Sequence, residues 1–501
     1  MAYVTAQVLG LLVTILVAYK ISQSYLRSYR IRRNGCAEPP CYPHKDPFLG
    51  LDLFGKYMDA FKSETFLDFN KQMFDRYGRT FKSNVLGTTT YRSIDPELSK
   101  AVFTTYASKF GLEPMRYNVA NHLWGNGIIV VDGERWKHAR ALMRPSFEVV
   151  HLANFERLEK HTATFMKLLP SDGTTVDIMP LFLRLALDTS SEFIFGESIG
   201  ALENPALGNR LTDAFAYALK GTAIRSTLSY FSFLHRDPKW WEACKTVTDY
   251  AEEHVERALQ RLRERGGDPQ SNQLLDGKKR LRLVDEMAKD TQDKFTLRSH
   301  IINAFSPAHD GAGIALSNAM FHLARHPEAW KKLREEVQPS AHEPLTYELL
   351  NSYRYLSWVL KETHRVTPFA TLNQRQCLET TILPFGGGAD GKSPLYVEKG
   401  DNIEVNYRAM MRDKSFWGED ADEFIPERWE RIRAGWEYTP FGGGPRVCPG
   451  QRLVFTESAY VLVTLLRKFE RIENHDPEIE WKEEMRMTFQ SKNGCLVGLI
   501  V

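Results

Sequence analysis

The chain has 501 residues, 43% of them hydrophobic, which is enough to bury one large core or several smaller ones. Its 65 Lys and Arg residues nearly balance its 63 Asp and Glu residues, so the formal net charge is only +2. That balance gives no global basic field, and we predict no nucleic-acid partner.

The N-terminal stretch is apolar and is followed by basic residues. Met1–Tyr19 carries no charge, and about twenty helical residues at ~1.5 Å each roughly cross a hydrocarbon core of about 30 Å. Lys20 and four arginines then precede the first acid, Glu38. By the positive-inside rule we predict a signal anchor at residues 1–25, with its N-terminus in the lumen and the rest of the chain in the cytosol. A cleaved secretory signal is the alternative, although its charge should precede the apolar stretch.

A proline-rich segment comes next. Three of the eight residues in Cys36–Pro43 are proline, and we predict a basic and proline-rich linker at residues 26–45. Residues 46–501 are then predicted to form one large domain. The six cysteines of the chain are scattered, as expected of a cytosolic domain without disulfides.

Trp136 and Arg140 lie four residues apart in a stretch with a helical pattern, Gly133–Arg140. That spacing places an indole N–H and a guanidinium on one face of the helix, where both can bind an anionic group. The plainer interpretation is an amphipathic helix with one core Trp and one exposed Arg.

Most of the rest of the chain has helical patterns. Arg265–Asn272 is a polar run of turn-forming residues and predicts a surface loop between two long helices. Asn318–Val337 has apolar residues at helical spacing and predicts a helix, while Leu395–Val397 and Asn402–Val405 predict short strands. The fold class is therefore predicted to be mainly α with small β-sheets.

Glu362 and Arg365 lie one turn apart on a helical stretch in which Leu356, Val359 and Leu360 fall at helical spacing. Taken alone, such a pair is typical of a solvated surface ion pair. Two further arginines follow, Arg375 just after this helix, and Arg428 within the segment Phe424-Ile-Pro-Glu-Arg-Trp429.

A glycine-rich run, Gly386–Ser393, satisfies the pattern G-x-x-x-x-G-K-S of phosphate-binding loops. That mechanism needs a helix directly after Lys392 and Ser393, so that the helix N-terminus faces the phosphate. Pro394–Val397 has the pattern of a strand instead. We therefore predict a glycine-rich connection between two strands, with nucleotide hydrolysis as the alternative.

Cys448 lies in the run Phe441-Gly-Gly-Gly-Pro-Arg-Val-Cys-Pro-Gly450, directly before the predicted helix Gln451–Leu466. Unpaired N–H groups and the positive end of the helix dipole stabilise a thiolate, which is the form that binds a metal. Arg446 adds positive charge. Zinc would need more ligands than one thiol, so a single thiolate suggests haem. A small buried Cys in a glycine-rich turn is the alternative.

At this point the chain resembles a known family. Phe441, Gly444, Arg446, Cys448 and Gly450 match the haem-binding signature of cytochromes P-450, the haem-thiolate monooxygenases. The Trp-x-x-x-Arg, Glu-x-x-Arg and Pro-Glu-Arg elements described above are similar to that family's other motifs and appear in its order. The resemblance covers nearly the whole chain and implies the cytochrome P-450 fold, with residues 46–501 as the catalytic domain.

The resemblance also implies a cofactor, haem b, with Cys448 as the axial thiolate ligand of its iron. By the same resemblance, Trp136, Arg140 and Arg375 contact the haem propionates. The other cofactor-binding residues that it implies are Phe441, Arg446 and Gly450.

Glu362, Arg365 and Arg428 are implied by the resemblance to form a structural ion network beneath the haem. Buried ion pairs of this kind do not by themselves imply stability, so we assign this network a positioning role.

Ser299–Ser317 occupies the place of the family's long helix across the distal haem face. Pro307 removes a backbone N–H, and Gly311 and Gly313 weaken the helix locally, so we expect a kink or groove. Most members have a threonine directly after the acid of this helix. Here Asp310 is followed by glycine, and the hydroxyl that helps to deliver protons is missing.

Two interpretations of this departure remain open. In the first, a water held by Asp310, His309 or the opened backbone replaces the hydroxyl, and the protein is a monooxygenase in which Asp310 is catalytic. In the second, it does not activate O2 and instead rearranges or dehydrates an oxidised substrate. A non-catalytic haem sensor is a third possibility, from a different functional class.

The resemblance implies partners and a location. Nothing in the sequence resembles a flavin or nicotinamide domain, so a membrane-bound NADPH-cytochrome P-450 reductase is expected to supply electrons. We expect a single-pass protein of the endoplasmic reticulum membrane, with its catalytic domain facing the cytosol.

The expected substrate is small and apolar. The chain is most similar in motif to fungal microsomal alkane and fatty-acid hydroxylases, and the altered oxygen site favours a specialised biosynthetic oxidation of a lipid-like or natural-product precursor.

Overall fold

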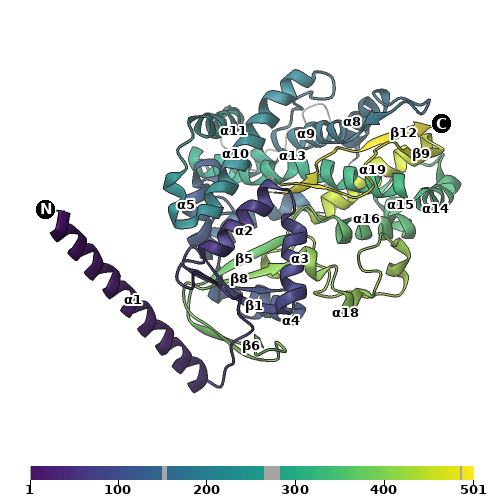
Figure 1. Cartoon of the computed structure of the whole chain (residues 1–501). Coiled ribbons are helices and arrows are strands. Elements are labelled where there is room, and N and C mark those ends of the chain that lie inside the picture. Colours follow the sequence, from purple (N-terminus) through teal and green to yellow (C-terminus); the bar gives the residue numbers. More distant parts are fainter. Residues whose placement is uncertain (1, 149–154, 265–281, 486–487) are drawn as a thin grey trace. The chain divides into compact units, whose positions relative to one another are not determined.

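The computed structural model describes residues 2–148, 155–264, 282–485 and 488–501 (Figure 1). The surface loop predicted at Arg265–Asn272 lies outside these residues. The described chain is mainly helical with small sheets, which confirms the predicted fold class. It divides into two compact units, each described by itself. The first comprises residues 1–111, 372–410 and 443–445, and the second comprises residues 112–371, 411–442 and 446–501.

The first unit is built around a five-stranded sheet with the order β1-β2-β8-β5-β3, in which β2 and β8 are parallel and the other neighbours are antiparallel. The named elements of this unit are α1 (Ala2–Arg33), α2 (Leu51–Lys62), α3 (Phe66–Tyr77), β1 (Thr80–Val85), β2 (Thr88–Ser93), α4 (Pro96–Lys100), β3 (Phe110–Gly111), β5 (Leu372–Cys377), β6 (Thr381–Gly387), β7 (Ser393–Val397), β8 (Asn402–Asn406) and α17 (Tyr407–Met410). Both strands predicted between residues 395 and 405 are confirmed as β7 and β8.

The glycine-rich run Gly386–Ser393 connects β6 to β7, which form an antiparallel hairpin. No helix follows Lys392, so the phosphate-binding alternative lacks the element that it requires. The glycines instead allow a close approach of the N-terminal segment. A Cβ on Gly387 would lie 2.4 Å from the carbonyl oxygen of Ala37, and the Ala37 N–H donates to the Pro394 carbonyl at 3.1 Å.

The C-terminal end of α1 is bonded to the turn that follows β7. Arg27 donates to Asp401 at 2.6 Å and to the Tyr91 hydroxyl at 2.7 Å, and Arg30 donates to Glu398 at 3.1 Å. Arg27 and Arg30 are therefore paired with acids of their own unit.

No helix formed by the described residues is both long and apolar enough to cross a membrane. The signal anchor predicted at residues 1–25 therefore has no support from the structure, and part of that stretch lies outside the described residues. Beyond Lys20, α1 carries the arginines described above, so no apolar window extends into that end of the helix.

The second unit consists mainly of helices. They are α5 (Glu113–Trp124), α6 (Gly133–Met143), α8 (Glu156–Lys167), α9 (Met179–Phe195), α10 (Pro205–Leu228), α11 (Pro238–Glu264), α12 (Leu283–Asp290), α13 (Lys294–Arg325), α14 (Pro327–Val337), α15 (Tyr347–Ser352), α16 (Arg354–Val366), α18 (Lys414–Trp417) and α19 (Gln451–Lys468). The antiparallel sheet β4-β12-β9 and the hairpin β10–β11 complete the unit, with β4 (Val176–Asp177), β9 (Arg471–Asn474), β10 (Glu483–Met485), β11 (Phe489–Ser491) and β12 (Leu496–Ile500).

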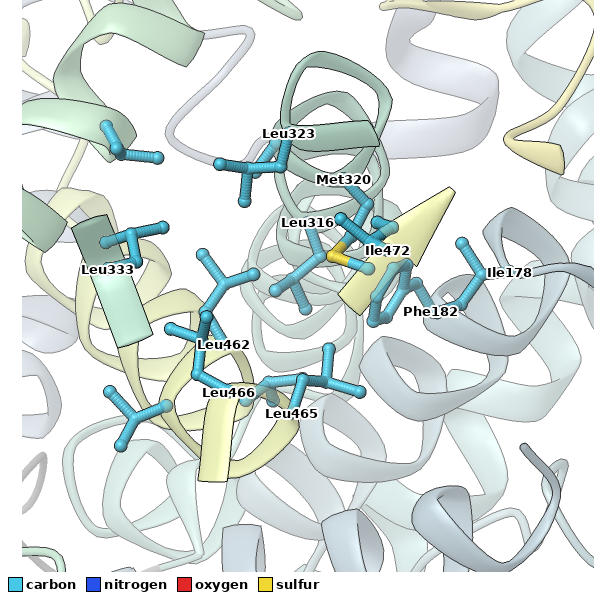
Figure 2. Packing of buried hydrophobic residues seen from close by; sticks show 14 of the residues in the cluster. Ile178, Phe182, Leu316, Met320, Leu323, Leu333, Leu462, Leu465, Leu466 and Ile472 are labelled. Carbon is cyan, nitrogen blue, oxygen red and sulfur yellow. The ribbon is translucent and has the colours of Figure 1, made fainter. Parts of the chain in front are cut away.

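The core of the second unit lies between α13, α19 and α9 (Figure 2). Leu316 and Met320 of α13 pack with Leu462 and Leu465 of α19, and Phe182 of α9 belongs to the same buried cluster. α13 is buried over most of its length, which explains why its apolar residues cover every face rather than one stripe. This arrangement fixes α13 and α19 within one rigid core.

One prediction about a helix needs correction. Asn318–Val337 is not one helix, because α13 ends at Arg325 and α14 begins at Pro327. Proline disfavours a helical conformation of the residue before it but is well suited to the first turn of a helix. α13 is continuous through Pro307, and the kink or groove expected there stays a prediction.

Candidate functional site

Cys448 lies in a turn immediately before α19, and its N–H donates to the Phe441 carbonyl at 3.1 Å. The thiol is half-buried. Burial raises the pKa of the Cys448 thiol, whereas the backbone N–H of Gly450, the charge of Arg140 and the N–H of Gln451 act in the opposite direction. The N–H groups at the helix N-terminus and the charge of Arg140 therefore favour the thiolate, as predicted, but burial outweighs them and the pKa of Cys448 is raised overall.

Arg446 stacks on Trp136. The guanidinium carbon lies 4.5 Å from the ring centroid, and the same guanidinium donates to Asp132 at 2.6 Å and to the Val131 carbonyl at 2.9 Å. Trp136 belongs to α6, so this contact joins the turn before α19 to the start of α6. Burial lowers the pKa of Arg446, and the neighbouring Asp132 acts in the opposite direction.

Arg140 lies one turn after Trp136 on α6, and its positive charge acts to lower the pKa of the Cys448 thiol. It is half-buried, and burial lowers its pKa. Among the residues that the structure describes, it has no ion-pair partner. A half-buried cation of this kind suits an anionic group of a ligand, such as a carboxylate.

Aromatic rings surround Phe441 within the second unit. Its ring lies 4.9 Å from His364 of α16, 5.6 Å from Phe455 of α19 and 5.9 Å from Phe369. His364 is buried, and burial lowers its pKa to about 4, so the ring is neutral at pH 7. The turn that carries Cys448 therefore has an apolar and uncharged wall.

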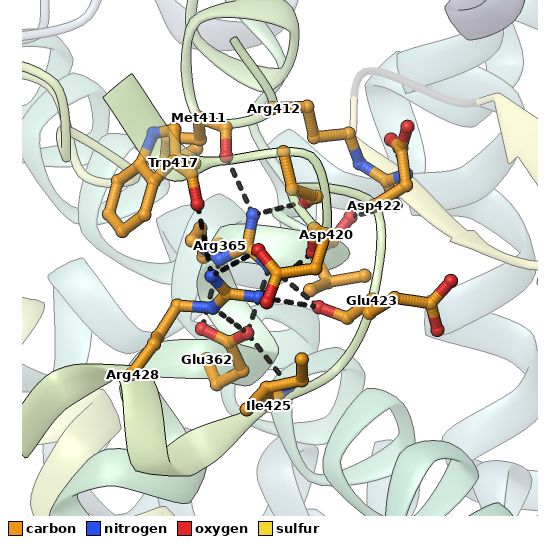
Figure 3. Close-up of polar contacts among 12 residues, drawn as sticks. Glu362, Arg365, Met411, Arg412, Trp417, Asp420, Asp422, Glu423, Ile425 and Arg428 are labelled. Carbon is orange, nitrogen blue, oxygen red and sulfur yellow. Dashed lines mark hydrogen bonds and ion pairs between the residues drawn. The ribbon is translucent and has the colours of Figure 1, made fainter. Parts of the chain in front are cut away.

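Glu362 is the centre of a buried ion network (Figure 3). Its carboxylate accepts from Arg365 at 2.8 and 2.9 Å, from Arg428 at 2.8 Å, from the Ile425 N–H at 2.9 Å and from the Trp429 indole at 2.9 Å. Arg365 also donates to three backbone carbonyls, those of Met411, Ala421 and Glu423. The structure thus brings together the three residues assigned to this network and satisfies their charges with hydrogen bonds.

α13 presents a different environment around Asp310, which is buried. A Cβ built on Gly311 would meet nothing within 4 Å, so there is open space beside this turn of the helix. Gly313 is tightly packed instead, since its Cβ would lie 2.8 Å from the Phe182 carbonyl. The ring of His309 stacks on the ring of Phe215, with 4.6 Å between the ring centroids.

Comparisons with known proteins are consistent with this geometry. The family model described as cytochrome P-450 matches residues 46–496. The chain is 40% identical to cytochrome P-450 monooxygenase iccC of Talaromyces variabilis over 473 residues, which cover 93% of each protein. It is 36% identical to apdE of Emericella nidulans over 94% of this chain and 90% of the relative, and 35% identical to iliC of a Neonectria species over 97% and 96%.

The chain belongs to the cytochrome P-450 family. It is an oxidoreductase, and its cofactor is haem with a cysteine thiolate as the ligand of the iron.

The residues of the second unit fit such a cofactor. Cys448 supplies one thiolate at a helix N-terminus, Arg140 is a cation that no described acid pairs with, and the side of α13 next to Gly311 is open. Among the described residues, no group of three or more His, Cys, Asp and Glu side chains could hold a metal ion without such a cofactor. The donor set of this cytochrome P-450 is therefore that of a haem-thiolate site.

Arg375, the remaining predicted haem contact, lies on β5 of the first unit. Its guanidinium carbon lies 4.8 Å from the centroid of the Phe103 ring, and its Nη1 donates to the Gln374 carbonyl at 3.0 Å. Its contact with a propionate stays a prediction. In the same unit, a Cβ on Gly444 would lie 2.0 Å from the Phe103 carbonyl oxygen, and Gly444 has a φ of 68°, so this position of the haem-binding signature requires glycine.

Sequence reasoning missed two residues of this site. Asp132 accepts from Arg446 and from the N–H groups of Leu112 and Glu113, both at 2.8 Å, and so joins the starts of α5 and α6 to the cysteine turn. Its signal in the sequence was its place directly before the α6 helix, where Asp is common. His364 lies inside the Glu-x-x-Arg motif itself, but only the fold reveals that its ring faces Phe441.

Proposed function

We propose that this cytochrome P-450 is a membrane-bound monooxygenase that inserts one oxygen atom from O2 into an apolar substrate, using electrons derived from NADPH. The observation that carries the proposal is the Cys448 turn, where a thiol meets two backbone N–H donors beside the cationic Arg140. A haem with a thiolate ligand supplies cleavage of the O–O bond, because the ligand donates electron density to the iron.

The side chains around this site have separate tasks in the proposal. Cys448 would bind the iron, and the N–H groups of Gly450 and Gln451 would tune the sulfur by hydrogen bonding. Arg140 and Trp136 would hold a propionate, and the wall formed by Phe441, His364 and Phe455 would exclude water from the sulfur side. Asp310 would hold and release protons on the α13 side.

The expected electron donor is a membrane-bound NADPH-cytochrome P-450 reductase. We also propose that the protein is a single-pass protein of the endoplasmic reticulum membrane with its catalytic domain in the cytosol, which is supported by the uncharged stretch Met1–Tyr19 and the arginines after it. Alkaline carbonate extraction tests this location. The full chain should stay with the membranes, a variant without residues 1–25 should be released more readily, and release of both would contradict the anchor.

A lipid-like or natural-product precursor of fungal specialised metabolism is the proposed substrate. Support comes from the relatives, which are cytochrome P-450 monooxygenases of fungi.

Isotopically heavy dioxygen tests the reaction. The full chain in membranes, with the reductase and NADPH, should transfer one labelled oxygen atom to a product from a panel of fatty acids, alkanes and apolar natural-product precursors. If NADPH is oxidised and O2 is reduced only to peroxide, with no labelled product, the panel lacks the substrate or the supply of protons has failed.

A haem-thiolate isomerase or dehydratase is the second candidate, and one observation favours it. The position after Asp310 has no hydroxyl, and a side chain there would meet open space. A reaction that proceeds without NADPH and without label from O2 would support this candidate.

A further inference from the structure

A buried polar stripe runs along one face of α13. Ser299, Asn303, Ser306 and Asp310 follow one another at spacings of four, three and four residues, which places them on the same side of the helix. All four are buried, with relative exposures of 1%, 1%, 4% and 9%. Polar side chains that line up on one face of a buried helix need a reason, because each buried polar group must be satisfied.

The first part of this stripe holds the turn that follows α5. The Asn303 amide donates to the Trp124 carbonyl at 2.7 Å and accepts from the Ile129 N–H at 2.9 Å, so one side chain fixes both ends of the turn. Gly125 and Gly127 make this possible. A Cβ on Gly125 would lie 2.1 Å from the Ser299 hydroxyl, and one on Gly127 would lie 2.1 Å from the Asn303 amide nitrogen.

Ser306 receives a hydrogen bond from the same turn, because the Trp124 indole donates to its hydroxyl at 3.1 Å. An indole N–H is only a donor, so Ser306 is the acceptor and keeps its own proton. The Ser299 hydroxyl, in contrast, donates a hydrogen bond to the Phe295 carbonyl one turn earlier, at 2.7 Å. Among the described residues, Ser306 makes no hydrogen bond other than the one from Trp124.

The next polar side chain on this face is Asp310, one turn after Ser306. Side chains four residues apart on a helix have Cβ atoms about 5–6 Å apart, which one bridging water can span. The carbonyl of Asn303 is a further acceptor near this turn, because Pro307, four residues later, has no N–H to donate to it. The open space beside Gly311 lies on the following turn.

We propose that Ser306, oriented by the Trp124 indole, is a positioning residue that supplies the hydroxyl of the Asp310 proton route, in place of the threonine that is absent after Asp310. The inference rests on the proposed monooxygenase function. Ser306 donates a hydrogen bond to the bridging water and holds it in place. After Asp310 has given up a proton, this water passes one proton to the Asp310 carboxylate and takes up one from solvent, so the water is also restored. Ser306 is unchanged at the end of the step, and the proton comes from solvent.

The test compares Ser306→Ala and Ser306→Thr with the unaltered enzyme, using reductase, NADPH and heavy dioxygen. Ser306→Ala should raise the ratio of peroxide to labelled product at least about fivefold and change the solvent deuterium isotope effect. Ser306→Thr, which keeps the hydroxyl, should stay within about twofold of the unaltered enzyme. The matched control is Ser299→Ala. Ser299 is also a buried serine on this face, but its hydroxyl already donates to the Phe295 carbonyl, so this variant should leave the ratio of peroxide to labelled product unchanged.

A second measurement does not depend on turnover. In the resting holoenzyme labelled with 15N-tryptophan, Ser306→Ala should speed hydrogen exchange of the Trp124 indole N–H about tenfold, because it removes the acceptor. Unchanged exchange would overturn the orientation by Trp124, and labelled product at an unchanged peroxide ratio would overturn the role of Ser306. Absence of labelled product from the unaltered enzyme would instead count against the proposed function, while the exchange result still decides the Trp124 contact.

Discussion

The Glu362 network and the polar stripe of α13 are both buried, yet they use hydrogen bonds differently. Around Glu362, the carboxylate and both guanidinium groups are engaged by side chains and backbone carbonyls (Figure 3). Along α13, the Ser306 hydroxyl accepts from the Trp124 indole and donates its own proton to no residue that the structure describes. A fully satisfied network maintains geometry, whereas proton transfer needs a donor that is not already committed to another group.

The largest effect is expected from Glu362→Ala. Removal of this carboxylate leaves Arg365 and Arg428 buried without their counter-charge, which costs about 3–5 kcal/mol in the free energy of unfolding. Thermal and denaturant unfolding would measure the loss, together with the haem content of the purified protein. Glu419→Ala, which breaks an exposed pair with Lys414, should unfold like the unaltered protein. Equal stability of the two variants would contradict the role assigned to Glu362.

Acid should lower the free energy of unfolding through His364, which belongs to the aromatic wall near Cys448. Burial lowers the pKa of His364 from 6.5 to about 4, so the unfolded chain takes up this proton at a higher pH than the folded one. Its contribution is fully present above about pH 6.5 and is lost as the pH falls towards 4, by about 3 kcal/mol at 1.36 kcal/mol per pKa unit. His364→Phe should remove that part of the pH dependence of unfolding. An unchanged pH profile in the variant would show that His364 does not contribute.

Two glycines of α13 sharpen the contrast between packed and open surfaces. Gly313→Ala should destabilise the protein by about 1–3 kcal/mol, since the new Cβ would lie 2.8 Å from the Phe182 carbonyl. Gly311→Ala meets nothing within 4 Å, and the higher helix propensity of Ala should stabilise the protein by up to about 1 kcal/mol. Unfolding of the two variants side by side measures both effects. The opposite order would contradict the open space at Gly311.

A smaller effect is expected at the end of α1. Asp401→Asn removes the charge that pairs with Arg27 and should cost about 1 kcal/mol, with faster tryptic cleavage after Arg27. Asp75→Asn, which affects an exposed pair with Lys71, is the control and should not change the cleavage rate. Cleavage at the same rate in both variants would show that α1 is not held through Asp401.

Much of the fold and part of the site could be predicted from local patterns. The helix after Cys448, the strands around residue 400 and the meeting of Glu362 with Arg365 follow from short-range spacing, which a sequence displays directly. The break between α13 and α14 was missed because Pro327 lies within a continuous apolar pattern. The contacts of Trp124 with Ser306 and of Asn303 with Ile129 join residues more than 170 positions apart, and no local pattern announces them.

The most direct test of this account is the balance of NADPH consumed, product formed and peroxide released by Asp310→Asn. If the α13 stripe handles protons while the Glu362 network maintains geometry, this variant should keep its haem and continue to oxidise NADPH, but the electrons should reduce O2 to peroxide with little product. Product formation with unchanged coupling would remove Asp310 from the mechanism and, with it, the distinction between the two regions.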